Sequence, residues 1–289
     1  MMTSTRMTEE ALGGLAAGIL GTLIGFPLDL IKTRMQTSQQ HHRSGILSTG
    51  RSILQTEGIL KMYKGVIPPL ISLTILNTFT FTAYSYFQQS YQAQRGWDWR
   101  NGWAGATCGP FSATVSTVEN LLKTQLQVDT ALRFRGTRDC VMQLTRQHGV
   151  GVIYSGHGIN TLREMTFLQT YFFVYEGLRQ ELMSRASGDT STWAIPVAGG
   201  FSGAIAWTVS FPLDCVRAGV QGRSDLGKPL RAMDVFRDLI GRKGVRGLFS
   251  GVSPSIARAF LVSSSRFSAY EMVLWMLRGG RDAGLDLNS

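Results

Sequence analysis

Three copies of one sequence pattern divide this chain, and no other feature restricts its fold as strongly. FPLDLIKTRMQ at residues 26–36 is matched by FPLDCVRAGVQ at residues 211–221, and a divergent copy, TVENLLKTQLQ, lies at residues 117–127. The copies begin 91 and then 94 residues apart. Such a period indicates one supersecondary unit built three times, with each copy burying its apolar face against its neighbours.

Two further landmarks keep the same period. An aromatic-x-glycine triplet and a downstream tyrosine each recur at intervals of 91 and 95 residues, at Gly65, Gly156 and Gly251 and at Tyr84, Tyr175 and Tyr270. We therefore predict a single domain, residues 1–289, made of repeats at about 8–92, 98–183 and 192–280. Each repeat is expected to contain a long helix broken near a proline, a short amphipathic helix and a second long helix.

Charge is sparse along the expected helices. Apolar residues make up 44% of the chain and charged residues only 17%. No charged residue occurs in residues 11–28, 65–94, 101–118 or 191–213, and each stretch is close to the roughly 20 residues that a membrane-spanning helix needs. The mean hydropathy of +0.03 is low for a membrane protein, which predicts helices with one apolar face and one face toward a polar lumen.

The second long helices of repeats two and three do not meet this charge-free criterion. The ionisable residues that interrupt them are Arg163, Glu164, Glu176, Arg258, Arg266 and Glu271. Such residues are costly at membrane depth and normally face a wet interior. We therefore predict an all-α membrane protein in which these two helices face a polar interior. Glycines at helical spacing, which allow close helix packing in lipid, mark the first helix of each repeat: Gly14, Gly18 and Gly21; Gly102, Gly105 and Gly109; Gly199 and Gly203.

Several functional classes receive no support. The net charge of +10 suits anionic lipid or an anionic substrate, but no basic run interleaved with aromatic residues predicts nucleic-acid binding. The three cysteines lack metal-ligand spacing, and His41-His42 has no further ligand nearby, so no metal is expected. No nucleophile-base pair, P-loop or dinucleotide fingerprint predicts an enzyme. The first ten residues are too short and acidic for a cleavable presequence, so any organelle address is expected to be internal.

The repeated motifs resemble the signature of the mitochondrial carrier family over almost the whole chain. They are Pro27-x-Asp29-x-x-Lys32 and Pro212-x-Asp214-x-x-Arg217, with Glu57-Gly58 ahead of Tyr63-Lys64-Gly65. The resemblance implies six transmembrane helices in three tandem pseudo-threefold repeats around a water-filled cavity, with three short matrix helices. It also implies a multi-pass protein of the mitochondrial inner membrane, with a peroxisomal membrane as the alternative. We expect it to function as a monomer, because the cavity lies within one chain.

The resemblance implies a gate at the matrix end. Pro27 and Pro212 would kink the first helices of their repeats, so that acids and bases of neighbouring repeats meet. The expected ion pairs are Asp29 with Lys123 and Asp214 with Lys32. Glutamines that brace this gate in some family members occupy all three positions: Gln36, Gln127 and Gln221.

A third ion pair is not expected at this gate. Asn120 stands where an acid should oppose Arg217, and Val118 replaces the middle proline. Glu119 is adjacent, but one residue on a helix is about 100° of rotation, so Glu119 is not expected to substitute. The matrix gate is therefore predicted to be intact but weakened.

The cytosolic gate matches the family pattern only in repeat two. Glu176 and Arg179 provide an acid and a base there, whereas the third repeat has Glu271 with Leu274 in place of the base. No regular ion pair between neighbouring repeats is expected at this end. The resemblance therefore predicts a resting state that is open to the cytosol.

A substrate site is predicted midway between the gates. Ser72, Arg163 and Arg258 lie twelve residues before the three tyrosines and are expected at one depth. The Arg163-Glu164 pair, together with Trp207, resembles the carnitine and ornithine carriers. A guanidinium could bind a carboxylate, Glu164 a cation, and the Trp207 ring could form a cation-π contact.

The expected substrate is a small zwitterionic metabolite. Leu76 occupies a position where ornithine-type carriers tend to have an acid, which favours carnitine, an acylcarnitine or another solute with a single cation over ornithine. A nucleotide or cofactor carrier is one alternative, and a non-transporting adaptor or proton leak derived from a carrier is another. No cofactor is expected other than cardiolipin as a bound lipid. Its implied binding residues are Gly58, Lys64, Gly65, Gly149 and Gly244, where amides and helix dipoles would meet phosphates.

Overall fold

The computed structural model describes residues 4–37, 46–129, 133–185, 191–223, 226, 231–252 and 254–255. Within these ranges the secondary structure is entirely helical, which confirms the all-α prediction. The α-helices are α1 (Ser4–Thr37), α2 (Ile46–Glu57), α3 (Ile67–Ser90), α4 (Trp99–Val128), α5 (Thr137–His148), α6 (His157–Arg185), α7 (Ser191–Gln221) and α8 (Ala232–Lys243). The 3-10 helices are η1 (Ile59–Tyr63), η2 (Val150–Tyr154) and η4 (Val245–Phe249).

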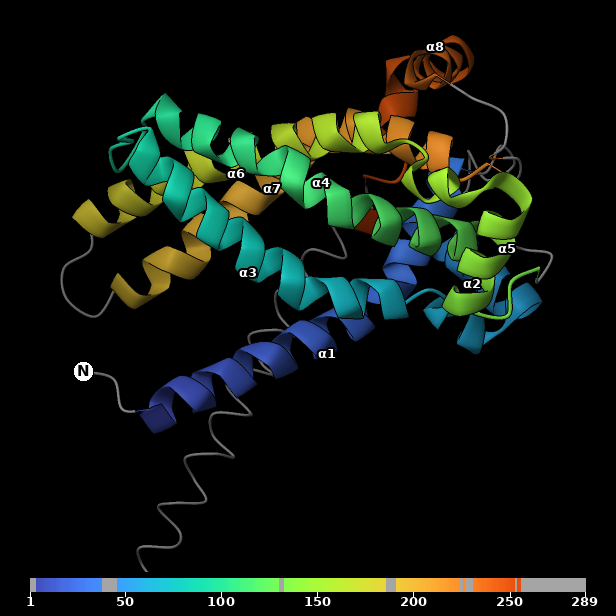
Figure 1. Ribbon diagram of the computed structural model, residues 1–289, viewed down its shortest axis with the longest axis horizontal. Coiled ribbons are helices and arrows are strands. Elements are labelled where there is room, and N and C mark those ends of the chain that lie inside the picture. Colours follow the sequence, from blue (N-terminus) through green and yellow to red (C-terminus); the bar gives the residue numbers. More distant parts are fainter. Residues whose placement is uncertain are drawn as a thin grey trace, which may run out of the picture.

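Long and short helices alternate along the chain. Repeat one provides α1, α2 and α3, repeat two provides α4, α5 and α6, and repeat three provides α7 and α8. The short helices α2, α5 and α8 lie at one end of the molecule, opposite the N-terminus (Figure 1); we call it the short-helix end. Helices α1 and α7 continue as α-helix through Pro27 and Pro212 respectively. No helix within the described ranges combines enough length and apolar character to cross a membrane.

Three glycines show how the repeats close into a ring. Gly65, Gly156 and Gly251 have φ values of 91°, 77° and 86°, in the left-handed region that glycine tolerates best. A side chain on Gly65 would meet α4, one on Gly156 would meet α7, and one on Gly251 would meet α1. Repeat one therefore packs on repeat two, repeat two on repeat three, and repeat three on repeat one.

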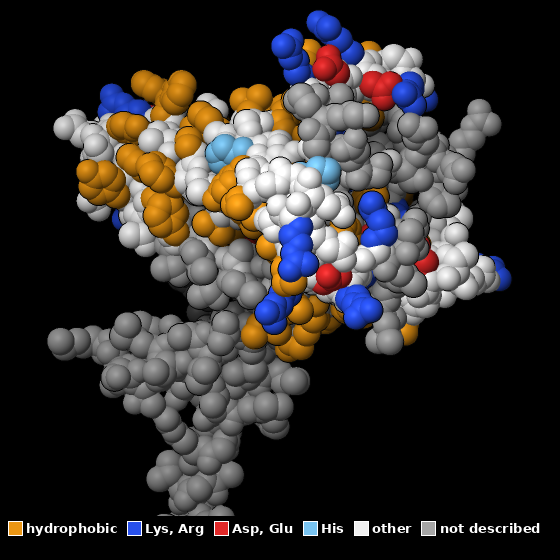
Figure 2. All heavy atoms as spheres, turned by 45° about the vertical axis from the view of Figure 1, so that its right-hand side comes forward, with side chains coloured by type: hydrophobic (Ala, Val, Ile, Leu, Met, Phe, Trp, Pro, Cys, Tyr) orange, Lys and Arg blue, Asp and Glu red, His pale blue; other side chains and the backbone are white. Residues whose placement is uncertain are grey.

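Many polar side chains are buried beside the hydrophobic clusters of the protein, and many large apolar side chains are exposed. Eight of the described polar residues have no exposed surface, namely Asn101, Thr117, Gln127, Asn160, Ser202, Ser210, Asp214 and Gln221. In contrast, large apolar side chains are more than half exposed at Trp103, Phe111, Phe201 and Val209. Figure 2 shows hydrophobic side chains gathered over one side of the body, whereas many of the visible charged side chains lie over the short helices. Buried polar residues and exposed large apolar residues are the departures from ordinary burial that call for an explanation.

The glycine spacing in α4 produces close contact with α6. An ideal Cβ on Gly105 would lie 2.4 Å from the carbonyl oxygen of Leu168, and one on Gly109 would lie 2.8 Å from the Cα of Met165. Both obstacles are backbone atoms, which cannot move without shifting a helix. Helix α7 has similarly spaced glycines, but an ideal Cβ on Gly203 would have no described atom within 4 Å.

We expect Gly105→Ala to destabilise the protein by about 3 kcal/mol, the upper part of the usual range for overpacking. Gly203→Ala is the matched control, since alanine is favoured over glycine in an open helical position by about 1 kcal/mol. Thermal unfolding of the purified proteins measures both effects. Equal melting temperatures for the two variants would contradict the close α4–α6 contact.

Candidate functional site

A cavity of about 220 Å³ lies between the repeats, and eight charged side chains line it. Helices α1, α4, α6 and α7 each contribute one acid and one base, whereas α3 contributes the apolar Leu76. The charged residues are Asp29 and Lys32, Glu119 and Lys123, Arg163 and Glu164, and Asp214 and Arg217. Four helices therefore bring equal numbers of positive and negative groups to one space.

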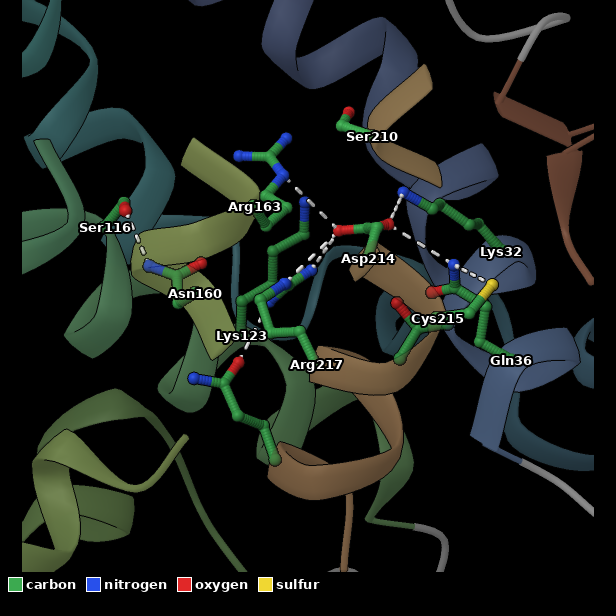
Figure 3. Close-up of polar contacts among 12 residues, drawn as sticks. Lys32, Gln36, Ser116, Lys123, Asn160, Arg163, Ser210, Asp214, Cys215 and Arg217 are labelled. Carbon is green, nitrogen blue, oxygen red and sulfur yellow. Dashed lines mark hydrogen bonds and ion pairs between the residues drawn. The ribbon is translucent and has the colours of Figure 1, made fainter. Parts of the chain in front are cut away.

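Asp214 is the centre of the charge network (Figure 3). Its carboxylate has no exposed surface and accepts a hydrogen bond of 2.5 Å from the Lys32 Nζ atom. The Arg217 guanidinium donates two more, at 2.7 and 3.2 Å, and the Gln36 Nε2 atom donates another at 3.3 Å. The Arg163 Nε atom lies 3.8 Å away. One carboxylate therefore links α1, α6 and α7.

Both ion pairs expected at the matrix end are formed. The Lys123 Nζ atom lies 2.6 Å from the Asp29 Oδ2 atom and joins α4 to α1, while the pair of Lys32 with Asp214 joins α1 to α7. Arg217 turns back to Asp214 in its own helix because Asn120 offers it no charge. These two ion pairs join repeat one to repeat two and repeat one to repeat three, while the longer contact of Arg163 with Asp214, at 3.8 Å, joins repeats two and three.

The three glutamines are buried beside these ion pairs but make different contacts. Gln36 donates to Asp214, and Gln221 accepts a hydrogen bond of 2.9 Å from Arg217. Gln127 instead accepts a hydrogen bond of 2.6 Å from the Thr33 hydroxyl, which ties α4 to α1 without a charge. Two glutamines therefore contact charged groups, and the third supports the same interface through a neutral bond.

The predicted substrate residues of α6 and α7 meet in the cavity. The Arg163 Nη1 atom lies 2.5 Å from the Glu164 Oε1 atom, which also accepts a hydrogen bond of 3.2 Å from Ser116. The Trp207 ring faces both cations: the Lys32 Nζ atom lies 4.3 Å from its centroid and the Arg163 Cζ atom 5.0 Å. These side chains form a compact group with a carboxylate, a guanidinium and an aromatic face.

Three other predicted substrate positions have different outcomes. Leu76 lines the cavity, as expected. The Ser72 hydroxyl is absent from the lining and donates a short hydrogen bond to Glu119 instead. Arg258 lies outside the described residues, as does Glu271 of the predicted cytosolic gate.

Glu119 is a cavity residue that the sequence motif did not identify. The motif excludes it as a replacement for the missing acid, because Glu119 is offset by one residue from that position. The spacing of Ser116, Glu119 and Lys123 at i, i+3 and i+7 places them on one helical face, and all three line the cavity. That helical spacing is the sequence signal that could have identified Glu119 as a cavity residue.

The end opposite the short helices is held differently. Glu176 and Arg179 lie 3.8 Å apart within α6, so their contact does not join two helices. Tyr84 of α3 donates a hydrogen bond of 3.2 Å to Asn101 of α4 and stacks on Phe172 of α6. Among the described residues, no ion pair joins different helices at this end.

The positions proposed for lipid binding adopt a shared backbone shape. Gly58, Gly149 and Gly244 have φ values of 79°, 81° and 63° and follow the last residues of α2, α5 and α8. Gly65 packs on α4, as described above. The Lys64 Nζ atom lies 2.9 Å from Asp129, so that ammonium group is held within the protein.

Asp129 holds the connection after α4. Burial would raise the pKa of its carboxyl, but the hydrogen bond from Lys64 and those from the amides of Phe134 and Arg133 lower that pKa to about 2. The carboxylate therefore stays ionised at neutral pH. It ties the loop after η1 to the start of the α4–α5 connection.

Repeated helix pairs around one charged cavity are the architecture of a solute carrier. A model of the mitochondrial carrier protein family matches residues 3–95, 97–186 and 188–280. The chain therefore belongs to the mitochondrial carrier family, whose members transport small molecules and are not enzymes.

Related proteins include carriers of two substrate classes. The mitochondrial basic amino acids transporter of Rattus norvegicus is 29% identical, covering 96% of this chain and 92% of the relative. A mitochondrial arginine transporter of Arabidopsis thaliana is also 29% identical, covering 94% and 92% respectively. The mitochondrial carnitine/acylcarnitine carrier of Mus musculus is 28% identical, covering 93% and 94%. The similarity supports a mitochondrial solute carrier.

Proposed function

We propose that the protein exchanges or imports a small zwitterionic metabolite across the mitochondrial inner membrane by alternating access. The substrate is carnitine, an acylcarnitine or an amino acid such as ornithine. The observation that carries this proposal is the balance of charge in the cavity, to which each of α1, α4, α6 and α7 contributes one acid and one base. Equal numbers of both signs complement a solute that carries both signs.

The same cavity disfavours a nucleotide carrier. Several phosphate charges would require cationic side chains that are free to bind them. Each described Lys or Arg in the lining lies between 2.5 and 2.7 Å from a carboxylate oxygen. The volume of about 220 Å³ is also below the roughly 300–1,000 Å³ of sites for drug-sized ligands. Both features favour a small solute without excess negative charge.

Substrate recognition is assigned to the group around Arg163. Its guanidinium can bind a carboxylate bidentately, Glu164 can bind an ammonium group, and the Trp207 ring can contact the cation face-on. A bound zwitterion would replace the contact of Arg163 with Glu164 by contacts to the solute. This exchange lets the substrate stabilise a state in which the cavity is closed to both sides.

The ion pairs at the short-helix end serve as the matrix gate in this proposal. The contacts of Asp29 with Lys123 and of Lys32 with Asp214 would break when the solute leaves toward the matrix. Because no described ion pair joins helices at the other end, we infer that the resting protein is open to the cytosol. The protein would work as a monomer, since one chain encloses the cavity.

The surroundings of the protein in this proposal are lipid. The exposed Trp103, Phe111 and Phe201 side chains suit a hydrocarbon environment. Cardiolipin is the proposed bound lipid, with phosphate near the glycines that follow α2, α5 and α8. A peroxisomal membrane is the alternative location, and nucleic acid is not a proposed partner.

Uptake into liposomes tests the function. The purified protein is reconstituted in liposomes loaded with carnitine, ornithine or ATP, and exchange of each labelled compound is measured. We expect exchange of carnitine or ornithine and none of ATP. Exchange of ATP alone would overturn the substrate class, and no exchange of any compound would favour a non-transporting adaptor.

Glu164→Lys tests the ammonium site within the same assay. The variant places a cation beside Arg163 and removes the acid that would bind the substrate cation, so we expect a loss of at least about tenfold in carnitine or ornithine uptake. Thr166→Ala in α6 is the control, because among the described residues its hydroxyl donates only to the Leu162 carbonyl of the same helix. A similar rate for Glu164→Lys and the control would argue against Glu164 as the cation site.

A further inference from the structure

The charges of the cavity are equal in number but not paired one to one. Asp214 takes two bases, Lys32 and Arg217, while Asp29 takes Lys123 and Glu164 takes Arg163. These ion pairs involve all four described Lys and Arg residues of the lining, so the fourth acid, Glu119, is paired with none of them. Within the described ranges, no Lys or Arg nitrogen lies within ion-pair distance of Glu119, which accepts a hydrogen bond from the Ser72 hydroxyl instead.

We propose that Glu119 of α4 binds a second positive charge on the substrate, so that this carrier selects a zwitterion with a cationic side chain, a dibasic amino acid. The inference rests on the proposed function and narrows its substrate class. A partly buried carboxylate that no described Lys or Arg pairs with is costly to keep inside a protein. A cationic group that arrives with the substrate removes this cost during each transport cycle.

The position of Glu119 fits such a substrate. Ser116 donates to the Glu164 carboxylate, and Glu119 lies three residues further along the same face of α4. The two carboxylates are therefore held about one helical turn apart along α4, on the order of 5 Å. An amino acid whose side chain carries a cation three or four atoms from its Cα spans this separation. Its ammonium group would contact Glu164, its side-chain cation Glu119 and its carboxylate Arg163.

The interpretation also accounts for Leu76 and Ser72. Leu76 removes an acid from α3, but Glu119 supplies one from the neighbouring helix. Ser72 does not reach the cavity itself; its hydroxyl bond fixes the rotamer of Glu119, which makes Ser72 a positioning residue.

Arginine and citrulline provide a matched pair of test solutes, because they have the same length and differ in side-chain charge. In liposome exchange, we expect the unmodified protein to prefer arginine over citrulline by at least about tenfold, as for a charge-assisted hydrogen bond. Glu119→Gln keeps the size and can still accept the Ser72 hydrogen bond. It is expected to lower arginine exchange at least about tenfold more than it lowers citrulline exchange.

Two further measurements separate the possible failures. Ser72→Ala keeps the charge of Glu119, so it is expected to reduce arginine exchange less than Glu119→Gln does. The rise in melting temperature that bound arginine causes should also be reduced less by Ser72→Ala than by Glu119→Gln. Equal reduction of arginine and citrulline exchange by Glu119→Gln would overturn the inference and leave a role in proton coupling or helix packing. If the unmodified protein exchanges neither amino acid nor carnitine, the proposed function itself fails.

Discussion

Asp214→Asn is expected to abolish transport and to lower the stability of the folded protein by about 3–5 kcal/mol, the range for removing one partner of a buried ion pair. Lys32, Arg217 and Arg163 all lie within 3.8 Å of this one carboxylate. Asparagine has nearly the same shape but no charge. Three cations would then face each other with only a neutral amide between them.

Transport should fall more than a hundredfold, because the state that is closed at the short-helix end loses this ion-pair free energy relative to the open state, and about 3–5 kcal/mol corresponds to two or more factors of ten in its population. Substrate exchange in liposomes and thermal unfolding in detergent measure the two effects. Ser210→Ala is the control in the same helix, since Ser210 is equally buried but, in the part of the chain that the structure describes, donates only to carbonyls of α7. An Asp214→Asn protein that transports within threefold of the unmodified protein would show that the network is not needed.

The closing contacts of the gate could be predicted because the family resemblance implies them and the repeat places the same residue types in neighbouring copies. Once the motifs align, Asp29 and Asp214 occupy equivalent positions in their repeats, and Lys32 and Lys123 occupy another equivalent position three residues further on. Ring closure by three repeats then brings each acid to the next base, whatever the details of packing. The bonds of 2.6 and 2.5 Å agree with that symmetry.

The sequence could not predict contacts that depend on how each helix is rotated toward the cavity. Glu119 was rejected on its angular offset from the motif, yet its true direction depends on the packing of α3 and α4, which brings Ser72 to its carboxylate. The glycines of α4 and α7 show the same limit. Their spacing is alike, but Gly105 meets the backbone of α6 and Gly203 meets no described atom.

Reversing the charge of Lys123 is the second change with a large expected effect. In Lys123→Asp, a carboxylate replaces the ammonium group that lies 2.6 Å from Asp29, so attraction becomes repulsion. Two charges 4 Å apart interact by about 4 kcal/mol at an effective dielectric constant of 20. The single variant should therefore transport at least a hundredfold more slowly, because its short-helix end cannot close.

The double variant Asp29→Lys with Lys123→Asp should restore exchange to within about tenfold, because it restores the attraction with the signs exchanged. Conformation can be read directly at Thr33 and Gln127, one turn further along α1 and α4, whose side chains are bonded at 2.6 Å. Cysteines at these two positions should crosslink in the unmodified background, poorly in Lys123→Asp, and again in the double variant. A single variant that crosslinks normally and transports slowly would mean that Lys123 acts on the substrate and not on the gate. If exchange and crosslinking both recover in the double variant, the ion pair of Asp29 with Lys123 acts in closing the short-helix end. A contact that only stabilised the fold would not change crosslinking and exchange together.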